Sequence, residues 1–352
     1  MNNQEKKIKI GIVGAGWVAN NRHIPAFKSD RRCSIVAIYD TTLEKAEKTA
    51  KKYKIKNIFS DYNSFLNSEI DAVVVCTPPM CHASVAKEAL LRNKHVLVEK
   101  PFSLTIADGK EIENIAKSNG LILFPGHNFL FSRAMLKIKE ELKKPDTGDI
   151  LHVSGYQWSS WMRHLPTWFP ELPGGLFFDE GPHFMYLMKY LVGDFSVTSA
   201  TYTKKEAGMK RPFENYVVSV KGERATGDFS MFFGSPMSEW LIVIMCQKKT
   251  LVYDMFRDFY FTFNPELKRT RMYPISVVAS FDRQVWKQYI KWIFRRYAIF
   301  KRHLYGADVI ARKFLDAITG KSEPILHPSD GYQAVEKIIE IIKKSGTNLY
   351  EV

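Results

Sequence analysis

The sequence predicts an α/β protein, with a doubly wound parallel sheet in its first part and an α+β domain after it. Two observations predict this arrangement. Apolar strand-like runs alternate with helical segments through residues 8–124, whereas period-two alternation of apolar and polar residues begins near residue 150. A chain of 352 residues is long enough for two domains with substantial cores. We place the boundary at Pro125, so that the domains comprise residues 1–125 and 126–352.

The first domain is expected to alternate strands and helices in chain order. Its strands are short β-branched runs, which are typical of strands buried on both faces. Strands are predicted at residues 8–13, 34–39, 58–59, 71–76, 95–98 and 121–124, and helices at 43–53, 61–66, 83–92 and 106–118.

The second domain is expected to combine a group of strands with several helices. Short turns such as Lys221-Gly222-Glu223 join some of the strands, as in an antiparallel meander. Strands are predicted at residues 150–158, 196–202, 216–221, 226–233, 240–245 and 250–253, and helices at 132–142, 182–192, 283–302, 307–319 and 331–344.

Composition narrows the class of protein. Hydrophobic residues make up 45% and charged residues 25%, as in soluble globular proteins. The four cysteines, Cys33, Cys76, Cys81 and Cys246, are too scattered for a disulfide framework or a zinc site, so we expect a reducing compartment and no metal. The N-terminus fits no signal peptide, and no apolar run is long enough to span a bilayer. We therefore expect a cytoplasmic protein.

The first predicted strand runs into Gly14, Gly16 and Ala19, in the spacing G-x-G-x-x-A. Gly14 allows a tight turn, Gly16 lets the backbone approach a pyrophosphate, and Ala19 seats the next helix closely. The start of that helix offers N–H groups and a positive dipole end to an anion. Asp40, after the second strand, can accept hydrogen bonds from both ribose hydroxyls and would repel a 2′-phosphate. The sequence therefore predicts dinucleotide binding and favours NAD over NADP.

Glu99-Lys100-Pro101 follows another predicted strand, and Thr77-Pro78-Pro79 follows the strand before it. The carboxyl ends of parallel strands face the ligand in such sheets, so both segments are candidates for the site. An amine there can donate a hydrogen bond to a substrate hydroxyl and stabilise the oxygen as charge builds on it. The Lys100-Pro101 peptide bond could be cis. The alternatives are a solvated Glu-Lys pair and a loop that only caps the next helix.

Asp179 and His183 flank the proline that should start a helix. Histidine has the right ordinary pKa to take a hydroxyl proton near neutrality, and a nearby carboxylate can orient it. The alternative is that Asp179 caps the helix and His183 is a buried, hydrogen-bonded histidine.

These motifs and several others occur in one order along nearly the whole chain: Gly14-Ala15-Gly16, Cys76-Thr77-Pro78-Pro79 with His82, His95 to Pro101, Gly126-His127-Asn128-Phe129, Gly174-Gly175, Asp179-x-Gly181-x-His183, Phe314-Leu315-Asp316-Ala317 and Asp330-Gly331. In this order they resemble the glucose–fructose oxidoreductase / inositol dehydrogenase / rhizopine catabolism (Gfo/Idh/MocA) family. Tyr186 departs from the pattern, because many relatives have an acid three residues after the histidine. Pro173 and Pro182 are also unusual.

The resemblance implies an NAD(P)-dependent oxidoreductase acting on a hydroxyl of a sugar, sugar nucleotide or cyclitol, and a dimer or tetramer. It implies an N-terminal Rossmann domain with a doubly wound parallel sheet and a C-terminal α+β domain with a large open, mostly antiparallel sheet. Lys100, Asp179 and His183 fall on the family's proton-handling positions, so His183 would take the hydroxyl proton while Lys100 steadies the oxygen. The residues then expected to bind the cofactor are Gly14, Gly16, Trp17, Val18, Asp40, Thr77, Pro78, His82, Glu99, Lys100, Asn128 and Arg163. Trp161 and Arg163 fall in a loop that often reaches cofactor or substrate in the family.

Two alternative functions remain open at this point. Some relatives use bound NAD for a transient oxidation during glycoside cleavage, and the fold can also serve as a non-catalytic NAD(P)-sensing regulator. The presence of Lys100, Asp179 and His183 together argues against the regulator.

The net charge of +14 is concentrated in one late segment. Residues 248–305 contain 13 lysines and arginines against 4 aspartates and glutamates. Within the helix predicted over 283–302, cations recur at every fourth residue from Arg283 to Arg295, and aromatic and isoleucine side chains gather on another side. This pattern is typical of a helix on an anionic membrane. The alternative is that the aromatic side packs on the second domain's sheet or on a partner subunit. The helix matches no nucleic-acid motif.

Overall fold

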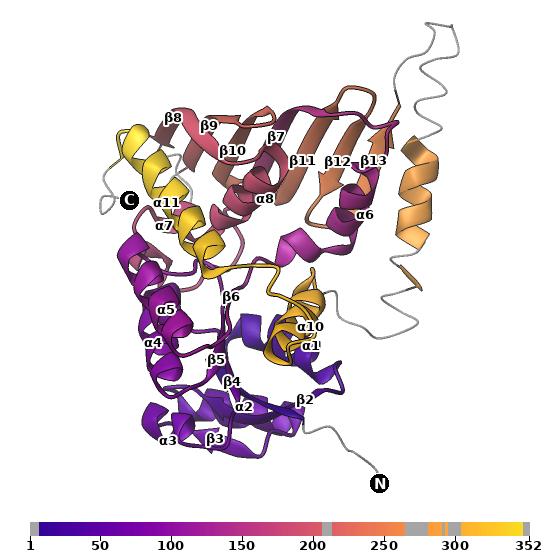
Figure 1. The fold of residues 1–352 in the computed structure, drawn as a ribbon. Coiled ribbons are helices and arrows are strands. Elements are labelled where there is room, and N and C mark those ends of the chain that lie inside the picture. The colour runs from indigo at the N-terminus through magenta and orange to yellow at the C-terminus, as the bar shows by residue number, and fades with distance from the viewer. Residues whose placement is uncertain (1–6, 206–212, 265–280, 291–292, 295–303, 348–352) are drawn as a thin grey trace, which may run out of the picture. The chain divides into compact units, whose positions relative to one another are not determined.

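The computed structural model describes residues 7–205, 213–264, 281–290, 293–294 and 304–347 (Figure 1). The chain divides into two units. The first comprises residues 1–131, 167–182 and 304–339, and the second comprises 132–166, 183–303 and 340–352. The boundary predicted after Pro125 leaves 167–182 and 304–339 in the second domain. These later segments join the first unit through contacts between residues far apart in sequence.

The first unit contains a six-stranded parallel sheet in the order β3-β2-β1-β4-β5-β6. Its central strands are apolar and buried, as their β-branched sequences predict. The strand order reverses between β1 and β4, which is where doubly wound sheets bind ligands. The strands are β1 Ile8–Val13, β2 Cys33–Tyr39, β3 Asn57–Phe59, β4 Ala72–Val75, β5 His95–Val98 and β6 Leu123–Pro125.

Two helices of the first unit, α3 and α5, begin where a side chain caps them. Asp61 accepts a hydrogen bond from Ser64 N at the start of α3, and Thr105 accepts one from Asp108 N at the start of α5. After the glycine loop the chain forms a π-helical turn, η1, and then α1. The helical segments are η1 Ala19–His23, α1 Ile24–Lys28, α2 Leu43–Tyr53, α3 Tyr62–Leu66, η2 Pro79–Cys81, α4 His82–Leu91, α5 Ile106–Ser118, η3 Asn128–Phe131, η4 Phe169–Glu171, α7 Gly175–Glu180, α10 Ala307–Ile318 and most of α11 Pro328–Lys344.

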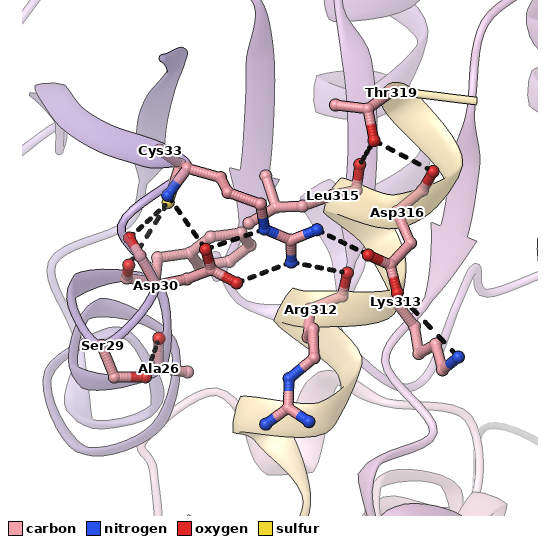
Figure 2. Close-up of polar contacts among 11 residues, drawn as sticks. Ala26, Ser29, Asp30, Cys33, Arg312, Lys313, Leu315, Asp316 and Thr319 are labelled. Carbon is pink, nitrogen blue, oxygen red and sulfur yellow. Dashed lines mark hydrogen bonds and ion pairs between the residues drawn. The ribbon is translucent and has the colours of Figure 1, made fainter. Parts of the chain in front are cut away.

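Helix α10 packs on the parallel-sheet domain rather than on the sheet that precedes it in sequence. The ring of Phe314 packs edge-on against Phe27, with 6.4 Å between ring centroids. Arg32 donates to Asp30 beside α1 and to Asp316 of α10, at 2.7 and 2.5 Å (Figure 2). Arg32 and Asp316 are 284 residues apart in sequence, so local patterning did not reveal their contact.

The second unit contains a seven-stranded sheet in the order β13-β12-β11-β7-β10-β9-β8. All neighbouring strands pair antiparallel except β7 and β10, which are parallel, so the sheet is mixed and not a simple meander. The sequence missed the edge strand β13. The strands are β7 Ile150–Ser160, β8 Phe195–Lys205, β9 Phe213–Gly222, β10 Thr226–Ser235, β11 Glu239–Cys246, β12 Thr250–Asp254 and β13 Phe259–Phe263.

Helices α6 (Arg133–Glu141) and α8 (Pro182–Val192) lie along one face of this sheet (Figure 1). The ring of Phe184 stacks on Phe229 of β10 at 5.4 Å and lies against Gly155 of β7. The neighbouring residues in the strands point the other way. Tyr156 and Val217 on that opposite face are exposed. Covered and uncovered faces therefore alternate along each strand, as the period-two pattern predicts.

Residues 281–290 and 293–294 are helical, within the segment where a helix is predicted over 283–302. Residues 291–292 and 295–302 of that prediction lie outside the described residues. Over the part of the chain that the structure describes, no helix is long and apolar enough to cross a membrane.

Candidate active site

The glycine loop follows β1 at the point where the strand order reverses. Gly14 has φ +93°, and a Cβ there would lie 2.6 Å from the carbonyl oxygen of Cys76 after β4. Only glycine fits this turn. At Gly16, by contrast, a Cβ would meet no atom within 4 Å. Open space beside the Gly16 backbone is what close approach of a pyrophosphate requires.

Asp40 holds the glycine loop in place. Its Oδ2 accepts a hydrogen bond from Ala15 N at 2.8 Å, and its Oδ1 accepts one from Thr42 N at 2.8 Å. A carboxylate has about four acceptor positions, so these bonds leave capacity for ribose hydroxyls. The residue predicted to read the ribose thus also anchors the loop that would hold the pyrophosphate.

The loop after β4 carries Thr77, Pro78 and His82. Thr77 Oγ1 is buried, and among the described residues it has no hydrogen-bond partner. His82 lies between two backbone carbonyls: its Nδ1 is 2.6 Å from Pro101 O and its Nε2 is 2.9 Å from Thr77 O. Burial lowers the pKa of His82. The buried ring therefore ties the loop after β4 to the loop after β5, and any effect of His82 on a cofactor would act through these loops.

Glu99 and Lys100 end β5, and the Lys100-Pro101 peptide bond is cis. Glu99 Oε1 lies 2.5 Å from Nε2 of His23, which is buried in η1. Glu99 Oε2 accepts a hydrogen bond from Lys100 N at 3.1 Å. Burial alone would raise the pKa of Glu99, but the bond to His23 and the nearby Lys100 charge outweigh it, so the pKa is lowered. The backbone of Lys100 is thus fixed by a charged side chain that another segment holds.

Lys100 Nζ is paired with Asp179 of α7. It donates to Asp179 Oδ1 at 2.7 Å and to Asp179 O at 2.9 Å. Burial disfavours the Lys100 ammonium, but the carboxylates of Asp179, Glu99 and Glu180 outweigh this and raise the pKa of Lys100. Lys100 is therefore a cation at neutral pH and a hydrogen-bond donor, not a base.

His183 lies in the second unit, on α8, and is 6% exposed. Its Nδ1 is 2.7 Å from the hydroxyl oxygen of Tyr186, one turn further along the helix. The sequence predicts that a carboxylate orients His183, with Asp179 as the candidate. The structure places Asp179 on Lys100 and gives His183 a tyrosine hydroxyl instead. The three-residue spacing on one helix was the signal for Tyr186.

Asn128 and a cation stacked on aromatic rings also lie in the first unit. Asn128 Nδ2 donates to Tyr305 O at 3.1 Å. The guanidinium of Arg22, in η1, lies 4.2 Å from the ring centroid of Tyr305 and 5.1 Å from that of Trp17. His23, Arg22 and Tyr305 were missed by the sequence, because Tyr305 is distant and a π-helical turn has no clear pattern. Arg163 lies on the loop after β7 in the second unit.

A nicotinamide dinucleotide fits the residues of the first unit. The open space at Gly16, the unpartnered Oγ1 of Thr77 and the remaining acceptor capacity of Asp40 suit pyrophosphate and ribose groups. Among the described residues, no group of histidine, cysteine and acidic side chains could hold a metal ion.

Residues 8–127 match the model of the GFO_IDH_MocA oxidoreductases, which have an NAD-binding Rossmann fold. The uncharacterized oxidoreductase sll0816 of Synechocystis sp. is 26% identical over 215 residues, which cover 59% of this chain and 57% of that protein. Glucose-6-phosphate 3-dehydrogenase of Bacillus subtilis is 23% identical over 246 residues, covering 68% of this chain and 67% of that one. The matches to sll0816 and to two further curated oxidoreductases each span little more than half of the relative's length.

The fold also resembles solved structures over almost its full length. The WlbA dehydrogenase from Bordetella pertussis, solved in complex with NADH and UDP-GlcNAcA, has a TM-score of 0.73 at 17% identity. The alignment covers 97% of each chain. At this identity the likeness establishes the fold alone. The predicted combination of a parallel sheet and a mostly antiparallel sheet is confirmed.

Proposed function

We propose that this chain, whose residues 8–127 match the Gfo/Idh/MocA family of oxidoreductases, is an NAD-dependent dehydrogenase acting on a hydroxyl of a sugar, a sugar nucleotide or a cyclitol. The observation that carries the proposal is the partly buried Lys100–Asp179 pair at the end of β5, in the same sheet as the strand β1 that leads into a glycine loop with open space at Gly16. The two relatives with assigned ligands, one named for a sugar phosphate and one solved with a sugar nucleotide, support the substrate class.

In the proposed mechanism, the nicotinamide supplies the hydride acceptor when bound. The Lys100 ammonium donates a hydrogen bond to the substrate oxygen and stabilises the negative charge that develops there. Asp179 keeps the amine charged and aimed, through the two bonds that it accepts. His183 takes the hydroxyl proton at Nε2, while its Nδ1–H donates to the oxygen of Tyr186.

NAD is the proposed cofactor because of the carboxylate at Asp40. Both of its oxygens are fixed by backbone N–H groups after β1 and β2, so the negative charge stays where a 2′-phosphate would lie. We expect a higher kcat/KM with NAD than with NADP, and Asp40→Ser should narrow the difference.

A homodimer is proposed to form on the uncovered face of the second unit's sheet. Tyr156 on β7, Val217 on β9 and Met245 on β11 are exposed on that face, and exposed apolar patches mark interaction sites. Light scattering after gel filtration should give a dimer, and Val217→Glu should give a monomer.

The experiment that tests the function is a substrate screen. Sugar phosphates, sugar nucleotides and cyclitols are incubated with NAD and with NADP, and nicotinamide absorbance is followed, with Lys100→Ala as the control. Reduction that Lys100→Ala abolishes supports the proposal. Release of a sugar without accumulation of NADH would favour transient oxidation during glycoside cleavage. NAD binding without turnover on any substrate would contradict an enzymatic role.

A further inference from the structure

The helical residues 281–290 are fastened to the open edge of the second unit's sheet. Gln284 Oε1 accepts from Thr262 N at 2.9 Å, and Gln284 Nε2 donates to Thr262 O at 3.0 Å. One turn later, Gln288 Oε1 accepts from Tyr260 N at 3.0 Å, and Gln288 Nε2 donates to Tyr260 O. The two side-chain amides thus pair with β13 as a further strand would, and they cover the edge of the sheet.

This attachment fixes which side of the helix points away from the sheet. With 3.6 residues per turn, Trp286, Ile290 and Phe294 fall on the side opposite Gln284 and Gln288. Their exposed fractions are 62%, 47% and 66%. The alternative in which the aromatic side packs on the second domain's sheet therefore does not hold for Trp286 and Ile290. The polar glutamine side faces the protein, and large apolar side chains face outward.

Cations flank the apolar side chains. Arg283 and Lys287 are exposed, and helical geometry puts them next to Ile290 and Phe294. We call these five residues, Arg283, Trp286, Lys287, Ile290 and Phe294, the outer face. It combines apolar side chains with positive charge in the most basic stretch of the chain.

We propose that the outer face binds the surface of an anionic lipid bilayer, with the helix lying in the plane of the interface. Trp286, Ile290 and Phe294 would insert between headgroups, because burial of exposed apolar side chains is favourable there. Arg283 and Lys287 would contact lipid phosphates, and their long stems let the charged groups reach the headgroup level. The attachment through Gln284 and Gln288 would fix the orientation of the bound protein.

Charge complementarity decides between this partner and two others. A symmetric contact between two copies through the outer face would bring Arg283 and Lys287 of both copies together, and the exposed acid at its border, Asp282, is one negative charge against two positive ones. Nucleic acid would match the charge, but Ile290 and Phe294 have no base-stacking partner on a duplex, and the sequence carries no nucleic-acid motif. An anionic bilayer matches both the cations and the apolar side chains.

The test is co-sedimentation of the full chain with vesicles of phosphatidylcholine, with and without phosphatidylglycerol. We expect binding to the anionic vesicles, at least tenfold weaker binding to the neutral ones, and a decline with salt because headgroup attraction is screened. Arg283→Glu/Lys287→Glu and Trp286→Ser/Phe294→Ser should each weaken binding at least tenfold.

Matched controls come from the first unit. Helix α2 is also lysine-rich and exposed, so Lys48→Glu/Lys51→Glu changes charge equally, and Leu91→Ser removes an exposed apolar side chain. Lys48→Glu/Lys51→Glu should weaken vesicle binding only as far as the lower net charge of the protein does. Leu91→Ser should bind vesicles like the wild type. Brominated lipid should quench less fluorescence in Trp286→Phe than in the wild type, which reports insertion even if another variant folds poorly.

Several results would overturn the proposal. Equal binding to neutral vesicles, or equal losses in the α2 control and the Arg283/Lys287 variant, would remove the role of the outer face. A change from dimer to monomer in Trp286→Ser/Phe294→Ser would assign the face to a second copy, and binding to duplex DNA but not to vesicles would assign it to nucleic acid. Dehydrogenase activity in solution does not enter this test, so the proposed function can fail or hold independently.

Discussion

Lys100 and His183, the two groups proposed to handle the substrate's hydroxyl, lie in contrasting surroundings. Lys100 is surrounded by charge: Asp179 binds its amine, and Glu99 binds its backbone N–H. His183 is paired with a neutral tyrosine hydroxyl on its own helix. The first arrangement keeps one protonation state at neutral pH, whereas in the second a hydroxyl group contacts the ring. A donor that must stay charged and a base that must change charge call for these different partners.

The largest effect is expected from removing the two groups. Lys100→Ala and His183→Ala should each lower kcat by about 1,000-fold, because charge stabilisation and proton transfer each contribute on this scale. Steady-state kinetics measures the loss, and fluorescence titration should show that NAD affinity stays within a few-fold. Near-normal turnover in either variant would remove that residue from the mechanism.

A smaller effect should separate the two surroundings. Tyr186→Phe removes the hydroxyl that contacts His183 Nδ1 and should lower kcat by roughly tenfold, because the productive tautomer is less favoured. Asp179→Asn should cost more, since it leaves the buried Lys100 ammonium without its ion-pair partner. If Tyr186→Phe lowers kcat as much as Asp179→Asn does, the contrast between the surroundings of Lys100 and His183 is wrong.

The glycine loop offers a comparison of binding with stability. Gly16→Ala should weaken NAD binding at least tenfold and leave the melting temperature of the free protein unchanged, because a Cβ there meets no protein atom. Gly14→Ala should destabilise the protein itself by about 1–3 kcal/mol, through its positive φ and the contact with Cys76 O. Thermal melts with and without NAD distinguish the two. A stability loss in Gly16→Ala would show that the loop is packed there.

The smallest effect is a pH dependence of stability. Burial lowers the pKa of His82 in the folded protein, so the unfolded chain binds more protons near pH 6. The contribution of His82 to stability should be present above its ordinary pKa of about 6.5 and be lost as the pH falls. Urea unfolding between roughly pH 5 and pH 8, the range where histidine titrates, measures the free energy of unfolding as a function of pH. His82→Asn should make this free energy depend less on pH. An unchanged slope would place the pH dependence elsewhere, with His95, whose pKa burial also lowers, as the next candidate.

Local pattern was sufficient for most of the parallel-sheet domain. The strands and helices before residue 125 were predicted within a few residues, because buried β-branched runs and G-x-G-x-x-A are strong short-range signals. The edge strand β13 was missed, although phenylalanine alternates with Tyr260 and Thr262 over its five residues. The sequence also left open which side of the basic helix meets the sheet, since periodicity shows that a helix has two faces but not which one is covered.

The sequence by itself determined the resemblance to the Gfo/Idh/MocA family, the order of most elements and the choice of Gly14, Lys100 and His183 as candidates. Only the tertiary structure decided the partners: that Asp179 serves Lys100 and that Tyr186 serves His183. It also decided that α10 belongs with the first sheet. The physical reason is range. Conformational preference and periodicity act over a few residues, whereas ion pairs and ring contacts form between segments that only the folded chain brings together.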